Sequence, residues 1–494
     1  MKDVLLLTLD IGTSSVRAML FDARGRTVPG AEVQIAYKQT TSADGGVQTD
    51  ADALLAHTVD SVQQLLQATG EATAARIAGV GMSCFWHSLL SVGEDGRAAT
   101  PLYSWADNRA RAQAAHLAQV LDPKAYHART GCVLHPNYWP AKLCWLHDTQ
   151  PALFHSVRTW MSFGEYVMLR LFGQASCSLS MASGTGLLNQ NTAQWDAQTL
   201  AALPIQASNL NTLTDRHVSQ SQLTGDYAQV LAPLRTTPWF PAVGDGACSN
   251  VGCGATDPSR IAINMGTSGA MRVAVEADTL SIPSGLFCYR IDGKRFLVGG
   301  AFANGGNVYA WQQTTLNLSG REFLSQELSK MPPDGHGLSV LPFWAGERSP
   351  GWHADARAAI LGMNLHTAPL EMMQASLEAV GYQFAAVHDL LLTQFPQATQ
   401  IVASGGALTH DPAWTQILAD IFGMSVSATK IGEATSRGAA LLALESLGLR
   451  RELSHIPTYL GRTYKPDAAR HAVYQKARAR YESLYALLIE RQQS

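Results

Sequence analysis

Apolar runs separated by turn residues recur along this chain and predict an alternation of strands and helices typical of an α/β protein. Residues 5–7 and 16–21 flank a turn of small residues and predict a β-hairpin, and 33–37 predicts a third strand. Buried strands are expected at 77–83, 296–302 and 401–403. Helices are expected at 50–69, 160–172, 370–392, 413–422 and 433–447, the last rich in alanine and suited to tight packing. The polar, aromatic stretch 127–142 is expected to be a loop.

The turn of the first hairpin carries residue types that suit a phosphate. Gly12 lets a ligand approach the backbone closely, and the hydroxyls of Thr13, Ser14 and Ser15 add donors beside exposed backbone N–H groups. Asp10 adds a carboxylate, and a carboxylate beside phosphates indicates Mg²⁺, bound directly or through water. An ordinary Gly/Ser hairpin turn has the same composition, so this motif alone leaves both interpretations open.

A second copy of the hairpin strengthens the phosphate hypothesis. Residues 260–275 again place a Gly-Thr-Ser turn, here Gly266, Thr267 and Ser268, between two apolar runs, with Asn264 in the place of Asp10. A hairpin repeated half a chain apart predicts two similar domains that face each other. The two turns could then hold the polyphosphate of one nucleotide from both sides.

Composition limits the class of protein. A chain of 494 residues is long enough for two large α/β domains, and a net charge of −3 argues against nucleic-acid binding. No apolar run is long enough to span a membrane and no signal peptide is recognisable, so no membrane association and a cytoplasmic location are expected. The seven cysteines lack the paired spacing of a zinc site and are expected to be reduced thiols.

Two further stretches suggest a binding site for a polyol. Trp86 and His87 follow the strand predicted at 77–83, where open α/β sheets bind ligands, although such a pair is also common in packing. In an extended segment, Trp105, Asp107 and Arg109 would point to one side and offer an aromatic platform, an acceptor and a cation. The alternative for these three residues is a surface ion pair beside a buried tryptophan.

The small-residue stretch 240–254 holds the candidate catalytic group. Asp245 lies between two glycines, which leave its carboxylate open to a substrate, although an Asp between glycines also occurs in simple turns. This stretch directly precedes the second hairpin and is the natural domain boundary. Further along, Gly405 and Gly406 join a strand to a helix and could seat a nucleotide. Neither a Walker-type loop nor a dinucleotide-binding fingerprint occurs.

These pieces, in this order, resemble the FGGY family of carbohydrate kinases from about residue 10 to 447. The family's C-terminal signature is matched by 358–363 and 371–378, and the N-terminal signature, more loosely, by 138–145, where Trp139 stands in the place of a small residue. Other motifs also fall in family order: Asp-x-Gly-Thr at 10–13, Gly-Asp-Gly at 244–246, Met-Gly-Thr-Ser at 265–268, Gly-Glu-Arg at 346–348 and Ser-Gly-Gly-Ala at 404–407.

The resemblance implies two RNase H-like domains of the actin-like ATPase superfold, with an interdomain cleft that closes over ATP, Mg²⁺ and a sugar. Residues 1–248 would form the sugar and phosphate side, and 249–494 the nucleotide side with a C-terminal helix. Asp245 would be the general base and Asp10 would orient the metal ion. The implied ATP-binding residues are Thr13, Ser14, Ser15, Arg17, Gly266, Thr267, Gly306, Gly405 and Gly406. The implied substrate-binding residues are Trp86, His87, Trp105, Asp107, Arg109 and Asp245.

The substrate is less sharply indicated. The runs 104–109, 127–132 and 138–142 are more similar to the gluconate kinases of the family, whereas the position of Trp86-His87 corresponds to Met-His in the xylulose kinases. Gluconate would require a cation, for which Arg109, Arg129, Lys142 and His87 are candidates. We therefore expect phosphorylation of D-gluconate, with D-xylulose as the alternative. A catalytically silent sugar or nucleotide sensor is a third hypothesis, and the resemblance also allows a homodimer.

Overall fold

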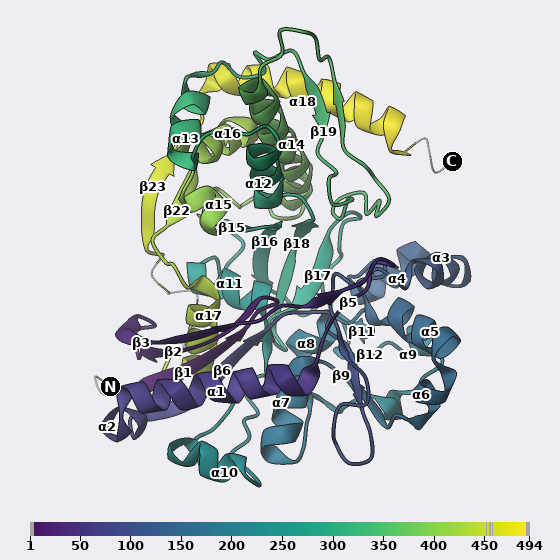
Figure 1. Cartoon of the computed structure of the whole chain (residues 1–494), viewed down its shortest axis with the longest axis vertical. Helices are drawn as coiled ribbons and strands as arrows, with labels where there is room; N and C mark the ends of the chain where they lie inside the picture. The colour runs from purple at the N-terminus through teal and green to yellow at the C-terminus, as the bar shows by residue number, and fades with distance from the viewer. Residues whose placement is uncertain (1–3, 451, 454–455, 457, 491–494) are drawn as a thin grey trace.

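The computed structural model describes residues 4–450, 452, 453, 456 and 458–490. It has two lobes, each built around a mixed sheet (Figure 1). The sheet of the first lobe has the order β3-β2-β1-β6-β14. Its strands are β1 (Leu5–Ile11), β2 (Ser15–Asp22), β3 (Thr27–Ala36), β6 (Ile77–Cys84) and β14 (Val243–Gly244). The hairpin predicted at the start of the chain is thus β1–β2.

The sheet of the second lobe repeats this order. It runs β17-β18-β16-β15-β21-β22-β23. Its strands are β15 (Arg260–Met265), β16 (Gly269–Glu276), β17 (Phe287–Arg290), β18 (Arg295–Phe302), β21 (Gln400–Ser404), β22 (Val426–Thr429) and β23 (Leu460–Tyr464). In both sheets an antiparallel meander is followed by two strands parallel to its first strand. The shared order confirms the predicted α/β class and the two similar domains.

Parallel pairing brings the ends of distant strands to one edge. Ile11 of β1 pairs with Cys84 of β6, and Cys84 pairs with Gly244 of β14. In the second sheet Asn264 of β15 pairs with Ser404 of β21. Since parallel strands finish at a common edge, the residues that follow these strands meet there.

Helices were expected at 50–69, 160–172, 370–392, 413–422 and 433–447, and α1 (Ala51–Thr69), α7 (Phe163–Phe172), α14 (Pro369–Gln394), α16 (Pro412–Phe422) and α17 (Ala434–Ser446) confirm them; the structure adds several others. In the first lobe these others are α2 (Glu71–Ala74), α3 (Arg111–Val120), α4 (Pro123–Thr130), α5 (Trp139–Thr149), α6 (Pro151–Ser156), α8 (Leu179–Ser183), α9 (Ala197–Leu200) and α10 (Tyr227–Val230). In the second they are α12 (Gly306–Thr315), α13 (Arg321–Lys330), α15 (Gly406–Thr409) and α18 (Ala468–Leu488). None of the described helices is both long and apolar enough to cross a membrane.

Small sheets and single turns complete the fold. The short strands are β4 (Thr40–Thr41), β5 (Val47–Thr49), β7 (Leu90–Val92), β8 (Leu102–Tyr103), β9 (Thr159–Met161), β10 (Cys177–Ser178), β11 (Leu188–Asn189), β12 (Gln194–Trp195), β13 (Leu213–Thr214), β19 (Ser339–Leu341) and β20 (Ala359–Leu361). Two 3₁₀ turns are η1 (Ala207–Asn209) and η2 (Ala232–Leu234).

Two helices pack against each other where the lobes meet, α11 (Asp245–Cys253) and α17 (Ala434–Ser446) (Figure 1). A Cβ at Gly252 would lie 1.7 Å from the carbonyl oxygen of Ala434, and one at Gly438 would lie 1.8 Å from that of Cys248. Glycine therefore permits this close contact. Although α17 belongs to the C-terminal half of the sequence, it packs on β1 and β6. The boundary expected after Cys248 lies within α11 and remains a prediction.

The loop expected at 127–142 is only partly a loop. Its first residues belong to α4, whose N-cap Asp122 accepts backbone N–H groups and which begins at Pro123, a residue favoured at the first helical position. Its last residues begin α5, where Pro140 lies in the first turn. The prediction was wrong there because a polar, aromatic composition was taken as typical of a loop, although Pro140 favours the start of a helix.

Candidate functional site

Two carboxylates lie at the common edge of the first sheet. Asp10 is near the end of β1, and Asp245 directly follows β14 at the start of α11. Burial, and then the negative charge of Asp245, raise the pKa of Asp10 to about 7. Burial also raises the pKa of Asp245, against the opposing effect of the Arg272 guanidinium. The charge of Asp245 disfavours ionisation of Asp10, and a nearby divalent cation would relieve this effect.

A cavity of about 210 Å³ opens beside Asp245 and is lined by residues of both lobes. Its lining combines one carboxylate with two guanidinium groups and several aromatic rings. The lining residues are Thr13, Trp86, His87, Trp105, Asp245, Asn264, Ser268, Gly269, Ala270, Arg272, Phe287, Ala301 and Arg348. The structure thus brings together five residues predicted from the sequence: Thr13, Trp86, His87, Trp105 and Asp245.

Trp86 supports the segment that carries Asp245. Its indole N–H donates to the carbonyl oxygen of Ser180 at 2.8 Å. A Cβ at Gly244 would lie 1.9 Å from the indole ring, and one at Gly246 would lie 2.7 Å from it. The two glycines beside Asp245 are therefore required by the packing of Trp86, a reason that the sequence alone did not reveal.

His87 enters the cavity as a neutral side chain. Burial, and then the charge of Arg348, hold the pKa of His87 well below its ordinary value. Its Nδ1 lies 2.5 Å from the carbonyl oxygen of Gly184, so Nδ1 carries the proton and donates. The Nε2 atom is left as an acceptor for a hydroxyl group. The backbone φ of His87 is 66°, a left-handed conformation that a non-glycine residue seldom adopts outside a functional or tightly held turn.

Asp107 and Arg109 do not lie with Trp105. The chain turns after β8, where the N–H of Asp107 donates to the carbonyl oxygen of Ser104 at 3.2 Å, so alternate residues no longer share a side. Asp107 is 2% exposed and forms an ion pair with Arg109, whose guanidinium stacks over the ring of Trp145 at 4.5 Å. Asp107 and Arg109 thus form an ion pair, as in the alternative, but the pair is largely buried rather than at the surface, Trp105 is only partly buried, and neither member of the pair lines the cavity.

Arg272 and Arg348 are the main cavity residues that sequence reasoning missed. Arg272 follows the second Gly-Thr-Ser turn on β16, and Arg348 is the last residue of the Gly-Glu-Arg motif. The Nε atom of each is buried without a hydrogen-bond partner, and neither forms an ion pair within the described part of the chain. The position of Arg272 one strand after the turn was the signal that could have identified it.

The turn of the first hairpin reaches the cavity through Thr13. The hydroxyl of Tyr37 donates to the carbonyl oxygen of Gly12 at 2.6 Å and thereby fixes the backbone of the turn. Ser14 is exposed, and Thr13 and Ser15 are partly exposed. Arg17 forms ion pairs with Glu32 and Glu433, so this predicted phosphate ligand is held by two carboxylates.

The glycines predicted to bind ATP converge at the edge of the second sheet. Gly306 donates its N–H to the carbonyl oxygen of Gly266 at 3.0 Å, and that of Asn307 donates to Thr267 at 2.9 Å. A Cβ at Gly405, whose φ is +88°, would lie 2.4 Å from the carbonyl oxygen of Met265. A Cβ at Gly266 would meet no atom within 4 Å, so this turn faces open space. Gly406 begins α15 beside it. Three backbone turns thus meet at this edge, and Gly306 and Gly405 permit their contact because a Cβ at either position would collide with a carbonyl oxygen.

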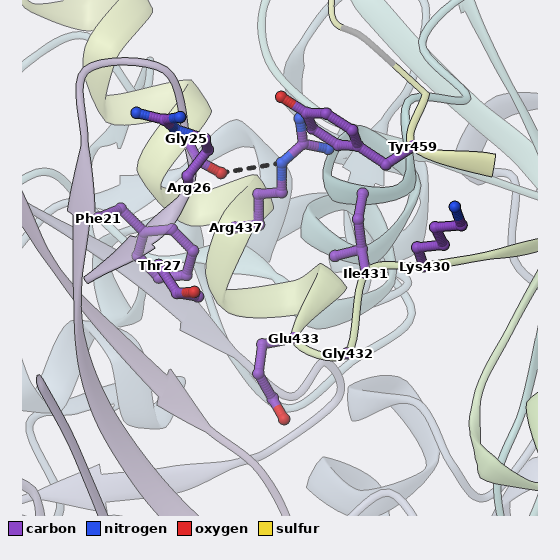
Figure 2. Close-up of a pocket in the computed structure, with 10 residues that line it drawn as sticks. All are labelled: Phe21, Gly25, Arg26, Thr27, Lys430, Ile431, Gly432, Glu433, Arg437 and Tyr459. Carbon is purple, nitrogen blue, oxygen red and sulfur yellow. Dashed lines mark hydrogen bonds between the residues drawn. The ribbon is translucent and has the colours of Figure 1, made fainter. Parts of the chain in front are cut away.

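A separate cavity of about 350 Å³ lies between the β2–β3 turn and the start of α17 (Figure 2). It contains none of the predicted ATP or sugar residues. The Nε atom of Arg437 donates to the carbonyl oxygen of Gly25 at 3.0 Å across it. Figure 2 shows Glu433, the partner of Arg17, at one end of this cavity. The contact between Arg17 and Glu433 therefore connects the first hairpin with the loop that leads into α17.

Within the described residues, one cluster of side chains has the spacing of a metal site: Asp334, His336 and Glu378. Its hydrogen bonds are those of a structural network. The Nδ1 atom of His336 accepts the N–H of Leu338 at 3.0 Å, so Nε2 carries the proton and donates to Glu378 at 3.0 Å. Asp334 pairs with Arg480 at 2.5 Å. A metal ion would have to displace that proton and compete with a cation.

Comparison with known proteins identifies the family of the chain. The chain matches the models of the FGGY family of carbohydrate kinases, the N-terminal domain over residues 5–252 and the C-terminal domain over 261–447. It is 27% identical to a gluconokinase of Bacillus subtilis (strain 168), covering 98% of this chain and 94% of the relative.

Solved structures of carbohydrate kinases are also similar to this chain. A gluconate kinase from Lactobacillus acidophilus superposes with a TM-score of 0.91 at 27% identity, covering 98% of each chain. A xylulose kinase from the same organism superposes with a TM-score of 0.91 at 28% identity, also covering 98% of each chain. Because the two family models together match most of the sequence and the lobes have the expected paired architecture, this chain belongs to the FGGY family of carbohydrate kinases.

Proposed function

We propose that this carbohydrate kinase phosphorylates the terminal hydroxyl of a sugar acid, D-gluconate, with ATP as the phosphoryl donor. The observation that carries the proposal is the charge of the cavity. Arg272 and Arg348 face it with a single carboxylate, Asp245, and His87 is held neutral. Two guanidinium groups, each with a buried Nε atom, beside one carboxylate leave an excess positive charge, which an anionic substrate would neutralise.

The cations suggested by the sequence are engaged elsewhere. Arg109 pairs with Asp107, and the Nε atom of Arg129 lies 3.0 Å from a carboxylate oxygen of Asp196. Lys142 is buried and donates to the backbone carbonyl oxygen of Asn137 at 2.6 Å. The substrate carboxylate is therefore assigned to Arg272 and Arg348.

The chemistry assigned to the chain is proton transfer and orientation. Asp245 accepts the proton of the terminal hydroxyl as its oxygen forms a bond to the γ-phosphorus, while the bond from that phosphorus to the bridging β–γ oxygen breaks and ADP leaves. The turn at 12–15 and the turn at 266–268 hold the phosphates from the two lobes. Trp86 and Trp105 exclude water from the reacting atoms, which limits hydrolysis of ATP.

Asp10 is the residue that would hold Mg²⁺. The ion supplies positive charge to the phosphate oxygens during transfer. The Asp10 carboxylate fits this role because burial and Asp245 disfavour its negative charge, and a cation would reverse that effect. Arg17 reaches the same turn but is paired with two carboxylates.

D-Xylulose remains the alternative substrate because a neutral ketose also fits a cavity with aromatic walls. A silent sensor is the third hypothesis, and the presence of both Asp10 and Asp245 argues against it. The test is ADP release, measured in a coupled assay with gluconate, xylulose, glycerol and other polyols. Activity with gluconate above all others supports the proposal, activity only with xylulose contradicts the sugar-acid assignment, and silence with every compound favours the sensor.

The charge argument is tested with Arg272→Met and Arg348→Met. Losing a charge-assisted hydrogen bond to the substrate carboxylate should raise the KM for gluconate about 10- to 100-fold. Arg357→Met, at an exposed position outside the cavity lining, is the matched control. If both cavity variants lose activity toward gluconate and a neutral polyol equally, the guanidinium groups do not recognise the carboxylate.

A further inference from the structure

The C-terminal helix contacts the loop that carries Arg348. This loop, 344–353, leads from the second lobe to the sugar cavity. Glu347 lies beside Arg348 and is 2% exposed. Both of its carboxylate oxygens accept the hydroxyl of Tyr485 on α18, at 3.0 and 2.8 Å. The C-terminal helix α18 thus holds Glu347, the residue next to the cavity cation Arg348.

The Glu347 carboxylate also fixes the other side of the same loop. It accepts the backbone N–H groups of Gly351 and His353, each at 3.4 Å. These two residues flank Trp352, whose φ of 61° is a conformation that costs a bulky residue free energy. A Cβ at Gly351 would lie 2.0 Å from the Tyr485 hydroxyl, so glycine is needed for this contact.

The loop in turn determines where the Arg348 side chain lies. Its guanidinium is 5.6 Å from the ring centre of Trp352 and 5.5 Å from that of Trp105 in the other lobe. The ring of Trp352 also contacts His135 and Tyr138 of the first lobe, at centroid distances of 5.5 and 6.4 Å. Arg348 is therefore held between one tryptophan from each lobe, and the Trp352 ring depends on the turn that Glu347 holds.

We infer that Glu347 and Tyr485 are positioning residues for substrate binding: they act through Arg348 and Trp352 and touch neither ATP nor the reacting hydroxyl. The inference rests on the proposed function in that this cavity takes the sugar. It does not depend on which sugar that is. Without the Tyr485 hydroxyl, the carboxylate loses its donor from α18, and the loop can sample positions in which Arg348 leaves the cavity wall.

The test compares Tyr485→Phe and Glu347→Gln with a matched control, Tyr474→Phe. Tyr474 is on the same helix, and its hydroxyl donates to another buried carboxylate, Glu378, at 3.1 Å without contacting the loop. For each full-length variant, kcat and KM are measured for ATP and for the compound that the panel identifies as substrate, together with the melting temperature.

Both loop variants should raise the sugar KM about 3- to 10-fold, the scale of one ordinary hydrogen bond, with the ATP KM within about twofold. Tyr474→Phe should lower the melting temperature comparably and leave the sugar KM unchanged. An unchanged sugar KM in Tyr485→Phe, or an equal rise in the control, overturns the inference. A panel in which gluconate is inactive but another sugar is phosphorylated overturns the proposed substrate and leaves this test intact.

Discussion

At the scale of single residues, burial determines what each charged group of the site can do. Asp10 and Asp245 are carboxylates whose pKa values are raised by burial, whereas Arg272 and Arg348 are cations without an ion-pair partner in the described part of the chain. None of these four would be selected for stability alone, because unpaired buried charges are costly. Their presence in one cleft indicates ligands that compensate those charges.

Asp10→Asn tests this cost directly. The pKa of Asp10 is raised to about 7, so between roughly pH 4 and 7 the folded protein keeps a proton that the unfolded chain releases. Stability therefore falls as the pH rises through this window, and above it the charged carboxylate destabilises the fold in full. The variant should be more stable than the wild type by about 1–3 kcal/mol at pH 8 and equally stable near pH 4.

The measurement is chemical denaturation with EDTA present, at both pH values, with Asp60→Asn as a control on the exposed face of α1. Adding Mg²⁺ and ATP should stabilise the wild type more than the variant. A variant less stable than the wild type at pH 8 would show that the Asp10 carboxylate is compensated by the protein itself.

At the scale of elements, the sequence was most informative where local pattern and environment agree. The hairpin β1–β2, its repeat β15–β16 and helices α1, α14 and α16 follow from apolar periodicity and turn residues. The turn after β8 could not be predicted from its own residues. The Asp107 carboxylate points inward because it accepts the N–H of Val47 at 3.1 Å, and Val47 belongs to a strand distant in sequence. Arg348 was missed for the same reason, because its neighbour Trp105 comes from the other lobe.

The crossing of α11 and α17 gives a prediction at this scale. Gly252→Ala places a methyl group 1.7 Å from the Ala434 carbonyl oxygen, so the helices must separate. Because α17 also packs on β1, which leads into the turn at 12–15, and on β6, which leads to Trp86 and His87, both stability and turnover should fall. We expect a loss of about 2–4 kcal/mol of unfolding free energy, the range of severe overpacking.

The control for this variant is Gly320→Ala, where a Cβ would meet no atom within 4 Å. Thermal and urea denaturation measure both proteins. Equal stability of the two variants would show that α11 and α17 can move apart freely, and the contact would then have no role in holding the lobes.

At the scale of the whole molecule, the site exists only because two similar lobes face each other. The first lobe supplies Asp245, Trp86 and Trp105 to the cavity and Asp10 beside it, and the second lobe supplies Arg272 and Arg348. Backbone contact also crosses between the lobes near the cavity, where the N–H of Cys288 donates to the carbonyl oxygen of Gly131 at 2.9 Å. Fold alone does not define a substrate, so the assignment to a sugar acid depends on the cavity cations.

Transfer of phosphate from ATP to gluconate, followed by ³¹P NMR for the wild type and Asp245→Asn, tests the account most directly. The wild type should form ADP and a phosphomonoester on the terminal carbon. Asp245→Asn should bind ATP with a Kd within a few-fold of the wild type and transfer phosphate at least ~10²-fold more slowly, the scale of general-base catalysis. Transfer by this variant at a rate near that of the wild type would contradict the role of Asp245, and with it the mechanism derived from this cleft.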